Sequence, residues 1–184
     1  LGAQHAWPSV YAAVAAARHA FDHGPWPRMQ PGERFAVMRR MSAILHARVG
    51  ETARAWSIQM GGLASFSGIM QAGSNATFDG IIAIAEEFEW VEKRPTVGAA
   101  VGMIAYEPVG VVAAIAPWNG PYGIMLNKVA YALAAGCCVI MKPSPETPLE
   151  AYIIAEAAQE AGVPEGVVNL VTGHREASDH LVCN

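Results

Sequence analysis

The sequence has few cysteines, few charged residues and no apolar run suited to a membrane. Only three of its 184 residues are cysteine, and charged residues make up 15%. Three cysteines without a regular spacing favour a reducing compartment over a disulfide framework, so we expect a cytoplasmic protein. The longest uncharged run, 108–127, contains three prolines and three glycines, which argues against a continuous helix in lipid. We therefore expect no membrane partner.

Three further absences narrow the function. The net charge is -4 and the 12 Lys and Arg residues are scattered, so the electrostatic pattern of a nucleic-acid-binding protein is missing. The six histidines show no metal-ligand spacing, and we expect no metal site. No GxGxxG loop occurs, so a bound dinucleotide would have to be held in another way.

The first half of the chain has a helical pattern. Apolar residues recur at helical spacing up to about residue 94. We expect helices that begin near Pro8 and near Pro31, a third that is broken at Gly61, and a long one from about Gly68 to Trp90.

From about residue 95 the pattern alternates between strand and helix. We expect two strands, 96–106 and 111–116, joined by a turn at 107–110. The second is apolar on consecutive residues, which is typical of a strand in a parallel sheet. The remaining elements are a helix at 122–135, a strand at 137–141, a helix at 149–161 that Thr147 could cap, and a strand at 167–171. This order predicts an α/β fold with overlapping βαβ units.

Polar residues follow each strand of the predicted parallel sheet. Ligands of such sheets bind outside the carboxyl ends of the strands, which groups Trp118, Asn119, Lys142, Ser144 and Gly173 on one rim. Lys142 could offer a cation to a ribose or phosphate, and Asn119 an amide donor to an oxyanion. Both have ordinary alternatives, because such a lysine is often a solvated charge and such an asparagine a turn residue or helix cap.

Neither the two neighbouring cysteines nor His174 has the sequence surroundings of a catalytic residue. Cys137 and Cys138 lie inside a predicted buried strand, where cysteine behaves as a small apolar residue. His174 follows a glycine in a predicted loop, and we expect it to be solvated.

Four segments in a fixed order resemble the aldehyde dehydrogenase superfamily. They are EPVGVVAAIAPWNGP, the helix with Lys128, GCCVIMKPSPETPL and EAGVPEGVVNLVTG. The early segment AAVAAARHAFDHGPWPRMQPGERFAVMRRM is also similar, so the resemblance covers nearly the whole chain. It implies N-terminal helices followed by an incomplete Rossmann-like parallel sheet. Residues 1–184 would then be part of an NAD(P)-binding domain, with a helical lead-in at 1–94, a Rossmann-like part at 95–184 and no catalytic domain.

The resemblance also implies roles for individual residues. Asn119 matches the oxyanion-binding asparagine, and Lys128 matches a lysine with a supporting role in the site, for which a structural hydrogen bond is an equal alternative. Gly120, Ile124 and Asn127 would face the aldehyde tunnel. The positions implied to contact or surround NAD or NADP are Ile115, Ala116, Pro117, Trp118, Lys142, Ser144, Pro145, Glu146 and Gly173.

One departure from the family pattern leaves the cofactor open. Many members place a glutamate three residues after the lysine, where it binds both ribose hydroxyls and favours NAD. Here that position is Pro145, and Glu146 follows one residue later. Losing the carboxylate would remove a repulsion against a 2′-phosphate, so NAD and NADP both remain candidates.

The activity implied is oxidation of an aldehyde to the carboxylic acid with NAD or NADP, in a homo-oligomer. The reaction would pass through a thiohemiacetal on a cysteine outside this chain, and a glutamate base would also lie outside it. We therefore expect the 184 residues alone to be inactive. A CoA-acylating aldehyde dehydrogenase or acyl-phosphate reductase is an alternative enzyme, and a non-catalytic nucleotide-binding homologue is an alternative of another class.

Overall fold

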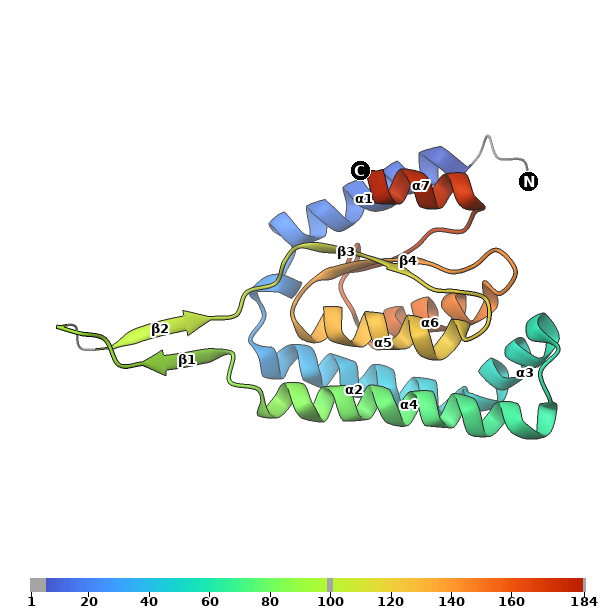
Figure 1. Cartoon of the computed structure of the whole chain (residues 1–184), viewed down its shortest axis with the longest axis horizontal. Coiled ribbons are helices and arrows are strands. Elements are labelled where there is room, and N and C mark those ends of the chain that lie inside the picture. Colours follow the sequence, from blue (N-terminus) through green and yellow to red (C-terminus); the bar gives the residue numbers. More distant parts are fainter. Residues whose placement is uncertain (1–5, 99–100, 184) are drawn as a thin grey trace.

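The computed structural model describes residues 6–98 and 101–183, and it consists of layers of helices around a small parallel sheet (Figure 1). Helices α1 (Ala6–His23) and α7 (Arg175–Cys183) lie side by side on one face of the sheet. Helices α5 (Pro121–Ala134) and α6 (Leu149–Glu160) pack below it. A further layer of helices covers α5 and α6 from the side away from the sheet.

The helical lead-in follows the predicted helices closely. It comprises α1, the short helix η2 (Trp26–Arg28), α2 (Pro31–Ala47), α3 (Val49–Met60) and α4 (Ala64–Glu87). The predicted break at Gly61 is confirmed. This glycine has a φ of 69°, and its N–H donates to the carbonyl of Ser57 at 3.0 Å, which ends α3. At the start of α2, Gln30 and Glu33 form a reciprocal capping box.

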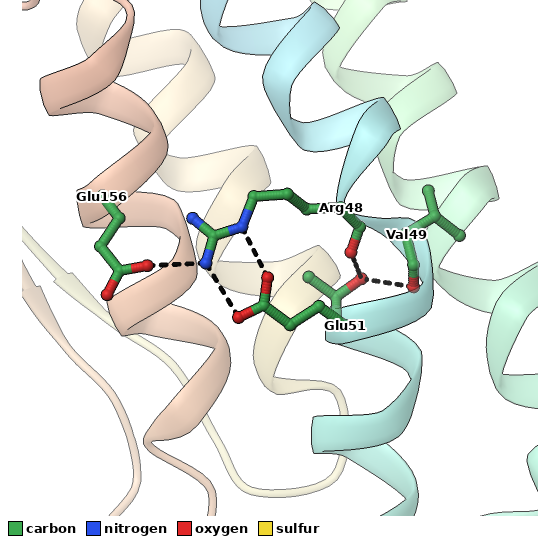
Figure 2. A network of polar contacts seen from close by, with 5 residues as sticks. Arg48, Val49, Glu51 and Glu156 are labelled. Atoms are coloured by element: carbon green, nitrogen blue, oxygen red, sulfur yellow. Dashed lines mark hydrogen bonds and ion pairs between the residues drawn. The ribbon is translucent and has the colours of Figure 1, made fainter.

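Arg48 joins the junction of α2 and α3 to α6 (Figure 2). Its guanidinium Nη2 lies 2.6 Å from Oε2 of Glu156, and its Nε lies 2.7 Å from Oε2 of Glu51. The hydroxyl of Thr52 donates to the carbonyl of Val49 at 3.0 Å. The Arg48 side chain thus contacts carboxylates of both α3 and α6.

The predicted structure of residues 91–106 was wrong, because the strand expected at 96–106 pairs with residues 91–94 and not with the strand that follows it. Residues 91–94, expected to be helical, form strand β1 (Val91–Arg94), which pairs antiparallel with β2 (Gly102–Ala105) in a separate hairpin. The turn at 107–110 therefore does not join two paired strands. The hairpin extends away from the body of the molecule (Figure 1), and three of the four β2 residues are exposed. A strand so exposed cannot share the buried sheet, and pairing with its neighbour along the chain satisfies its backbone.

Aromatic contacts explain why α4 ends where the hairpin begins. The ring of Phe88 lies 4.8 Å from that of Trp90 and 5.1 Å from that of Tyr106, both edge-on. The Trp90 indole N–H donates to the carbonyl of Ala85 at 3.1 Å. These contacts turn the chain out of the helix and hold the base of the hairpin.

The predicted parallel sheet is confirmed. It has the order β3 (Val111–Ile115), β4 (Cys138–Lys142), β5 (Val168–Leu170), with all pairs parallel. Every residue of the central strand β4 is buried, including Lys142 at its end. Its first four residues are all apolar, which is typical of a strand covered on both faces.

Two details at the C-terminal end of the chain differ from the predictions. Residues 175–183 form α7, where no helix was expected. The prediction that Thr147 caps α6 was wrong, since its buried hydroxyl has no hydrogen-bond partner among the described residues. Instead, the N–H of Leu149 donates to Oε1 of Gln59 at 2.9 Å, so a side chain from α3 occupies the start of α6.

Within residues 6–98 and 101–183, no helix combines the length and apolar character needed to cross a membrane.

Candidate functional site

A pocket of about 460 Å³ opens at the carboxyl ends of β3 and β4. The register of the sheet places Ile115 opposite Lys142, and the N–H of Ala116 donates to the Lys142 carbonyl at 3.1 Å. The ends of the two strands are thereby held together. The residues that line the pocket are Ile115, Ala116, Trp118, Lys142, Ser144, Pro145, Glu146, His174, Arg175 and Ser178.

Seven of the nine positions predicted for the cofactor therefore lie around one hollow. The other two, Pro117 and Gly173, do not line it. Pro117 stands between two lining residues, and Gly173 directly precedes His174. The strand register accounts for this convergence, because parallel strands carry their following loops to the same edge.

Lys142 is the most deeply placed polar group of the pocket. Its side chain is 2% exposed, and its Nζ donates to the carbonyl of Pro143 at 2.8 Å. Burial lowers the pKa of Lys142, and the nearby carboxylate of Glu146 opposes this shift. No carboxylate of the described residues lies within ion-pair distance of Nζ. Because an ammonium has three donors and the described residues supply one acceptor, the group has capacity for a further polar partner.

The loop after β4 carries a negative charge at the rim. The Ser144 hydroxyl donates to the carboxylate of Glu146, which holds the pKa of Glu146 below its usual value. Pro145 and Glu146 are both exposed, and Ser144 is half-buried. The pocket thus combines a buried cation, an exposed carboxylate and the apolar wall of Trp118.

Helix α7 and the residue before it contribute three lining residues that the sequence analysis did not assign to the site. His174, Arg175 and Ser178 face the loop of Glu146 from the other side of the pocket. A helical signal was present, because Ala177 and Leu181 are spaced by four residues and both are buried.

Asn119 and Lys128 lie outside this pocket. Asn119 is exposed in the loop that leads from β3 into α5, and among the described residues its amide has no hydrogen-bond partner. Lys128 is exposed on α5, and nothing in the described part of the chain connects it to the pocket. Asn119 directly follows the pocket residue Trp118 in the sequence but does not line the pocket, and Lys128 lies apart from it.

A second hollow lies away from the first pocket and shares no lining residue with it. It is a groove of about 280 Å³ between α4 and α5. A Cβ atom on Gly123 would lie 2.7 Å from the Ser74 hydroxyl, so this glycine allows the two helices to approach closely. Of the three positions expected at an aldehyde tunnel, Asn127 lines the groove, whereas Gly120 and Ile124 do not. The lining residues are Ile69, Met70, Gly73, Ser74, Thr77, Gly123 and Asn127.

Neither cysteine of the sheet region has the surroundings of a nucleophile. Cys137 is 2% exposed and Cys138 is fully buried. Burial raises the pKa of Cys138 to about 11, so its thiol stays protonated at neutral pH. In the described residues, no group of three or more histidine, cysteine or acidic side chains could hold a metal ion.

Comparisons with known proteins agree with this architecture. A geranial dehydrogenase from Castellaniella defragrans is 39% identical over 171 residues, which are 92% of this chain and 36% of that protein. The solved structure of an aldehyde dehydrogenase from Mycobacterium tuberculosis in complex with NAD+ is 39% identical, with a TM-score of 0.90 over 95% of this chain and 36% of that one. An NAD-dependent aldehyde dehydrogenase from Sinorhizobium meliloti superposes with a TM-score of 0.91 at 35% identity, over 96% of this chain and 35% of that one.

The chain thus has the aldehyde dehydrogenase fold over about a third of the length of these relatives. The predicted fold class, N-terminal helices followed by a Rossmann-like sheet, is confirmed. The sequence also matches the pattern of the aldehyde dehydrogenase family over residues 4–184. From its strand order, its sequence and its superposition on solved relatives, the chain belongs to the aldehyde dehydrogenase family.

Proposed function

We propose that the protein containing this chain oxidises an aldehyde to the carboxylic acid with NAD or NADP. The observation that carries the proposal is the pocket at the ends of β3 and β4, with the buried cation of Lys142 inside it and the amide of Asn119 one residue beyond its wall at Trp118. Family membership supports the same reaction, since one relative that shares this fold is an NAD-dependent aldehyde dehydrogenase and another is an aldehyde dehydrogenase solved in complex with NAD+.

The pocket has the chemistry that a dinucleotide requires. The ammonium of Lys142 retains donors for ribose hydroxyls or a phosphate, and Arg175 and His174 at the rim add donors of the same kind. The indole of Trp118 offers a flat apolar wall. When bound, the nicotinamide group would accept the hydride that leaves the aldehyde carbon.

The choice between NAD and NADP depends on the loop after β4. Glu146 is the carboxylate of this loop, and its hydrogen bond with Ser144 holds it at the rim of the pocket. Pro145, which precedes it, carries no charge. A carboxylate directed at the ribose would favour NAD, because it can accept hydrogen bonds from the two ribose hydroxyls. A carboxylate that points away from the ribose would tolerate the 2′-phosphate of NADP. We propose that both cofactors are accepted.

Asn119 is proposed as the oxyanion donor of the reaction. Its exposed amide has no partner among the described residues, so its N–H groups can bind an oxygen that becomes negative as a nucleophile attacks the aldehyde. The nucleophile would be a cysteine thiolate outside this chain, and water activated by a glutamate, also outside it, would supply the second oxygen of the acid. Lys128 is proposed as a positioning residue on α5.

The test is the reduction of NAD and NADP by the whole purified protein with a panel of aldehydes. We expect aldehyde-dependent formation of reduced cofactor in the absence of CoA and phosphate. A strict requirement for CoA or phosphate would instead identify an acylating enzyme. Absence of reduction with either cofactor, in protein shown to be folded, would refute the proposal.

We also propose that the protein is a cytoplasmic homo-oligomer. The hairpin β1–β2 exposes apolar side chains, among them Met103 and Ile104, away from the body of the molecule (Figure 1). Apolar patches of this kind are typical of protein interfaces. Three free cysteines fit a reducing compartment. Sedimentation of the whole protein tests the assembly, and Met103→Glu should shift it toward smaller species.

A further inference from the structure

We propose that His19 and His23, in the last turns of α1, form an open binding site for a divalent transition-metal ion of the class of nickel, copper and zinc. Imidazole nitrogens would be the ligands, and water would fill the remaining positions around the ion. The inference is independent of the proposed oxidation, and it takes the place of the sequence-based expectation of no metal site. It is carried by the geometry of the two rings, by their exposure and by the firm packing of the helix beneath them.

The two imidazole rings lie next to each other on one face of α1. Their centroids are 4.7 Å apart and their planes are inclined by only 21°, so the rings are stacked. A spacing of four residues places side chains one above the other along a helix. Zinc binds imidazole nitrogen at about 2.0–2.1 Å, so two nitrogens at right angles around one ion lie roughly 3 Å apart. Small rotations of the two exposed rings about their side-chain bonds bring the nitrogens to that separation.

The helix that carries the pair is fixed on its opposite face. His19 and His23 are exposed, whereas Ala17 and Ala20 are buried in the core. Helix α1 packs against all three strands of the parallel sheet and against α7, and it lies on the outer side of the sheet (Figure 1). Gly166 approaches this helix so closely that a Cβ atom there would lie 2.9 Å from the Cβ of Ala20. Two ligands on a support held in this way lose little conformational entropy when they close on an ion.

The charges near the pair roughly balance, so they do not exclude a cation. Arg18 and Asp22 form an ion pair and cancel each other. Arg28 brings a positive charge to the C-terminal end of α1, where it donates to the carbonyl of Gly24 at 2.7 Å. The partial negative charge of the helix end opposes that positive charge. His23 is the last residue of α1 and therefore has this negative end beside it.

The ligand type selects the class of ion. Imidazole suits zinc, copper and nickel, whereas magnesium and calcium prefer oxygen ligands. Among the described residues, no group of three or more histidine, cysteine or acidic side chains could enclose an ion, so the pair forms an open site. We therefore expect the affinity to rise from manganese through cobalt and nickel to copper, and to be lower for zinc than for copper.

The first experiment measures nickel binding to the whole protein, without a polyhistidine tag, by isothermal titration calorimetry at pH 7.5. All samples carry Cys183→Ser, because an exposed thiol is itself a metal ligand. We expect His19→Gln and His23→Gln each to weaken binding by about tenfold or more, since the second ligand on a shared ion acts intramolecularly.

The matched control for the loss of one exposed histidine is His174→Gln, which should leave nickel binding unchanged. Circular dichroism checks that each variant keeps its helices. Nickel affinity within about twofold of the unaltered protein in either His19→Gln or His23→Gln would overturn the proposal, and so would an equal loss in His174→Gln.

The second experiment moves the pair along the helix. In the His23→Gln protein, Ala15→His recreates a spacing of four residues with His19 and should restore most of the lost affinity. Ala12→His instead places the second histidine seven residues from His19, about 10.5 Å along the helix axis, and should restore none. Both alanines are exposed, so either histidine can be added without disturbing the core. Any pattern other than restoration by Ala15→His alone would contradict an ion shared across one turn of α1.

Discussion

The hydroxyl of Tyr122 donates a hydrogen bond to the side-chain carbonyl of Asn75 at 2.5 Å, across the buried contact between α5 and α4. Each residue is only 1% exposed, and the Nδ2 of Asn75 has no partner among the described residues. Burial raises the pKa of Tyr122, so its hydroxyl remains a donor over the whole physiological range. This bond ties together the two helices whose residues line the groove of about 280 Å³.

Removing this hydroxyl should destabilise the protein. Tyr122→Phe leaves the carbonyl of Asn75 buried without a donor, and we expect the free energy of unfolding to fall by about 1–3 kcal/mol. Urea unfolding followed by circular dichroism measures the change. Tyr131→Phe, on the exposed face of α5, is the control and should be near neutral. Equal stability of the two variants would show that the bond contributes nothing.

Glu150 should make stability depend on pH. Its side chain is fully buried, Oε2 accepts a hydrogen bond from Gln59, and Oε1 has no partner in the described residues. Burial raises the pKa of Glu150, so the folded state favours the protonated carboxyl. Stability from this group is therefore fully present below the unfolded pKa of about 4.3 and is lost as pH rises through the raised folded pKa.

The variant Glu150→Gln should remove that loss. It mimics the protonated carboxyl, so the free energy of unfolding at neutral pH should rise and its decline with pH should become shallower. Chemical unfolding at a series of pH values tests this, with Glu160→Gln, exposed at the end of the same helix, as the control. A decline that survives in Glu150→Gln would show that another group causes it.

The ion pair of Arg48 and Glu156 should contribute little to the free energy of unfolding. The side chain of Glu156 is 61% exposed, so water and salt screen its charge. Glu156→Gln should cost about 1 kcal/mol or less in unfolding free energy, and the cost should shrink in high salt. A larger, salt-independent cost would mean that Arg48 needs this carboxylate to hold α3 against α6.

Asn119→Ala should slow turnover without weakening the binding of the cofactor. As the proposed oxyanion donor, Asn119 acts on the charge that develops during attack, so its loss should lower kcat by about a hundredfold or more. The dissociation constant for NAD, measured by fluorescence titration, should stay unchanged because Asn119 does not line the pocket. Near-normal kcat would remove Asn119 from the chemistry.

Lys142→Met should weaken cofactor binding by about tenfold or more, the scale of one charged hydrogen bond. Because burial lowers the pKa of Lys142, affinity of the unaltered protein should also begin to fall at a lower alkaline pH than an exposed lysine would allow. Lys93→Met, on the exposed strand β1, is the control for the loss of one charge. An unchanged dissociation constant in Lys142→Met would exclude Lys142 from the cofactor site.

Much of the candidate site could be predicted because its residues follow strands. The apolar runs that become β3 and β4 are local features, and each is followed at once by its polar loop. Once the strands are parallel, Trp118 and Lys142 must meet at one edge. The resemblance to the family added Ser144, Pro145 and Glu146, which also line the pocket.

The site residues on α7 could not be predicted from the strands that they follow. Arg175 and Ser178 reach the pocket only because α7 packs beside α1 and over the end of β3. That packing depends on contacts between the two ends of the chain, such as the ring contact of Tyr11 with His180. The sequence pattern near residue 175 carries no information about its distant partner.

By itself, the sequence determined the order of the elements other than β1 and α7, the parallel sheet and the loops that carry Lys142 and Asn119, because apolar periodicity and glycine or proline stops act over a few residues. Only the tertiary structure decided the rest. It paired β2 with β1, placed Gln59 at the start of α6 in place of Thr147, and buried Lys142 with no carboxylate of the described residues in ion-pair contact. Each of these depends on which distant surfaces pack together, and burial, not local propensity, selects among the alternatives.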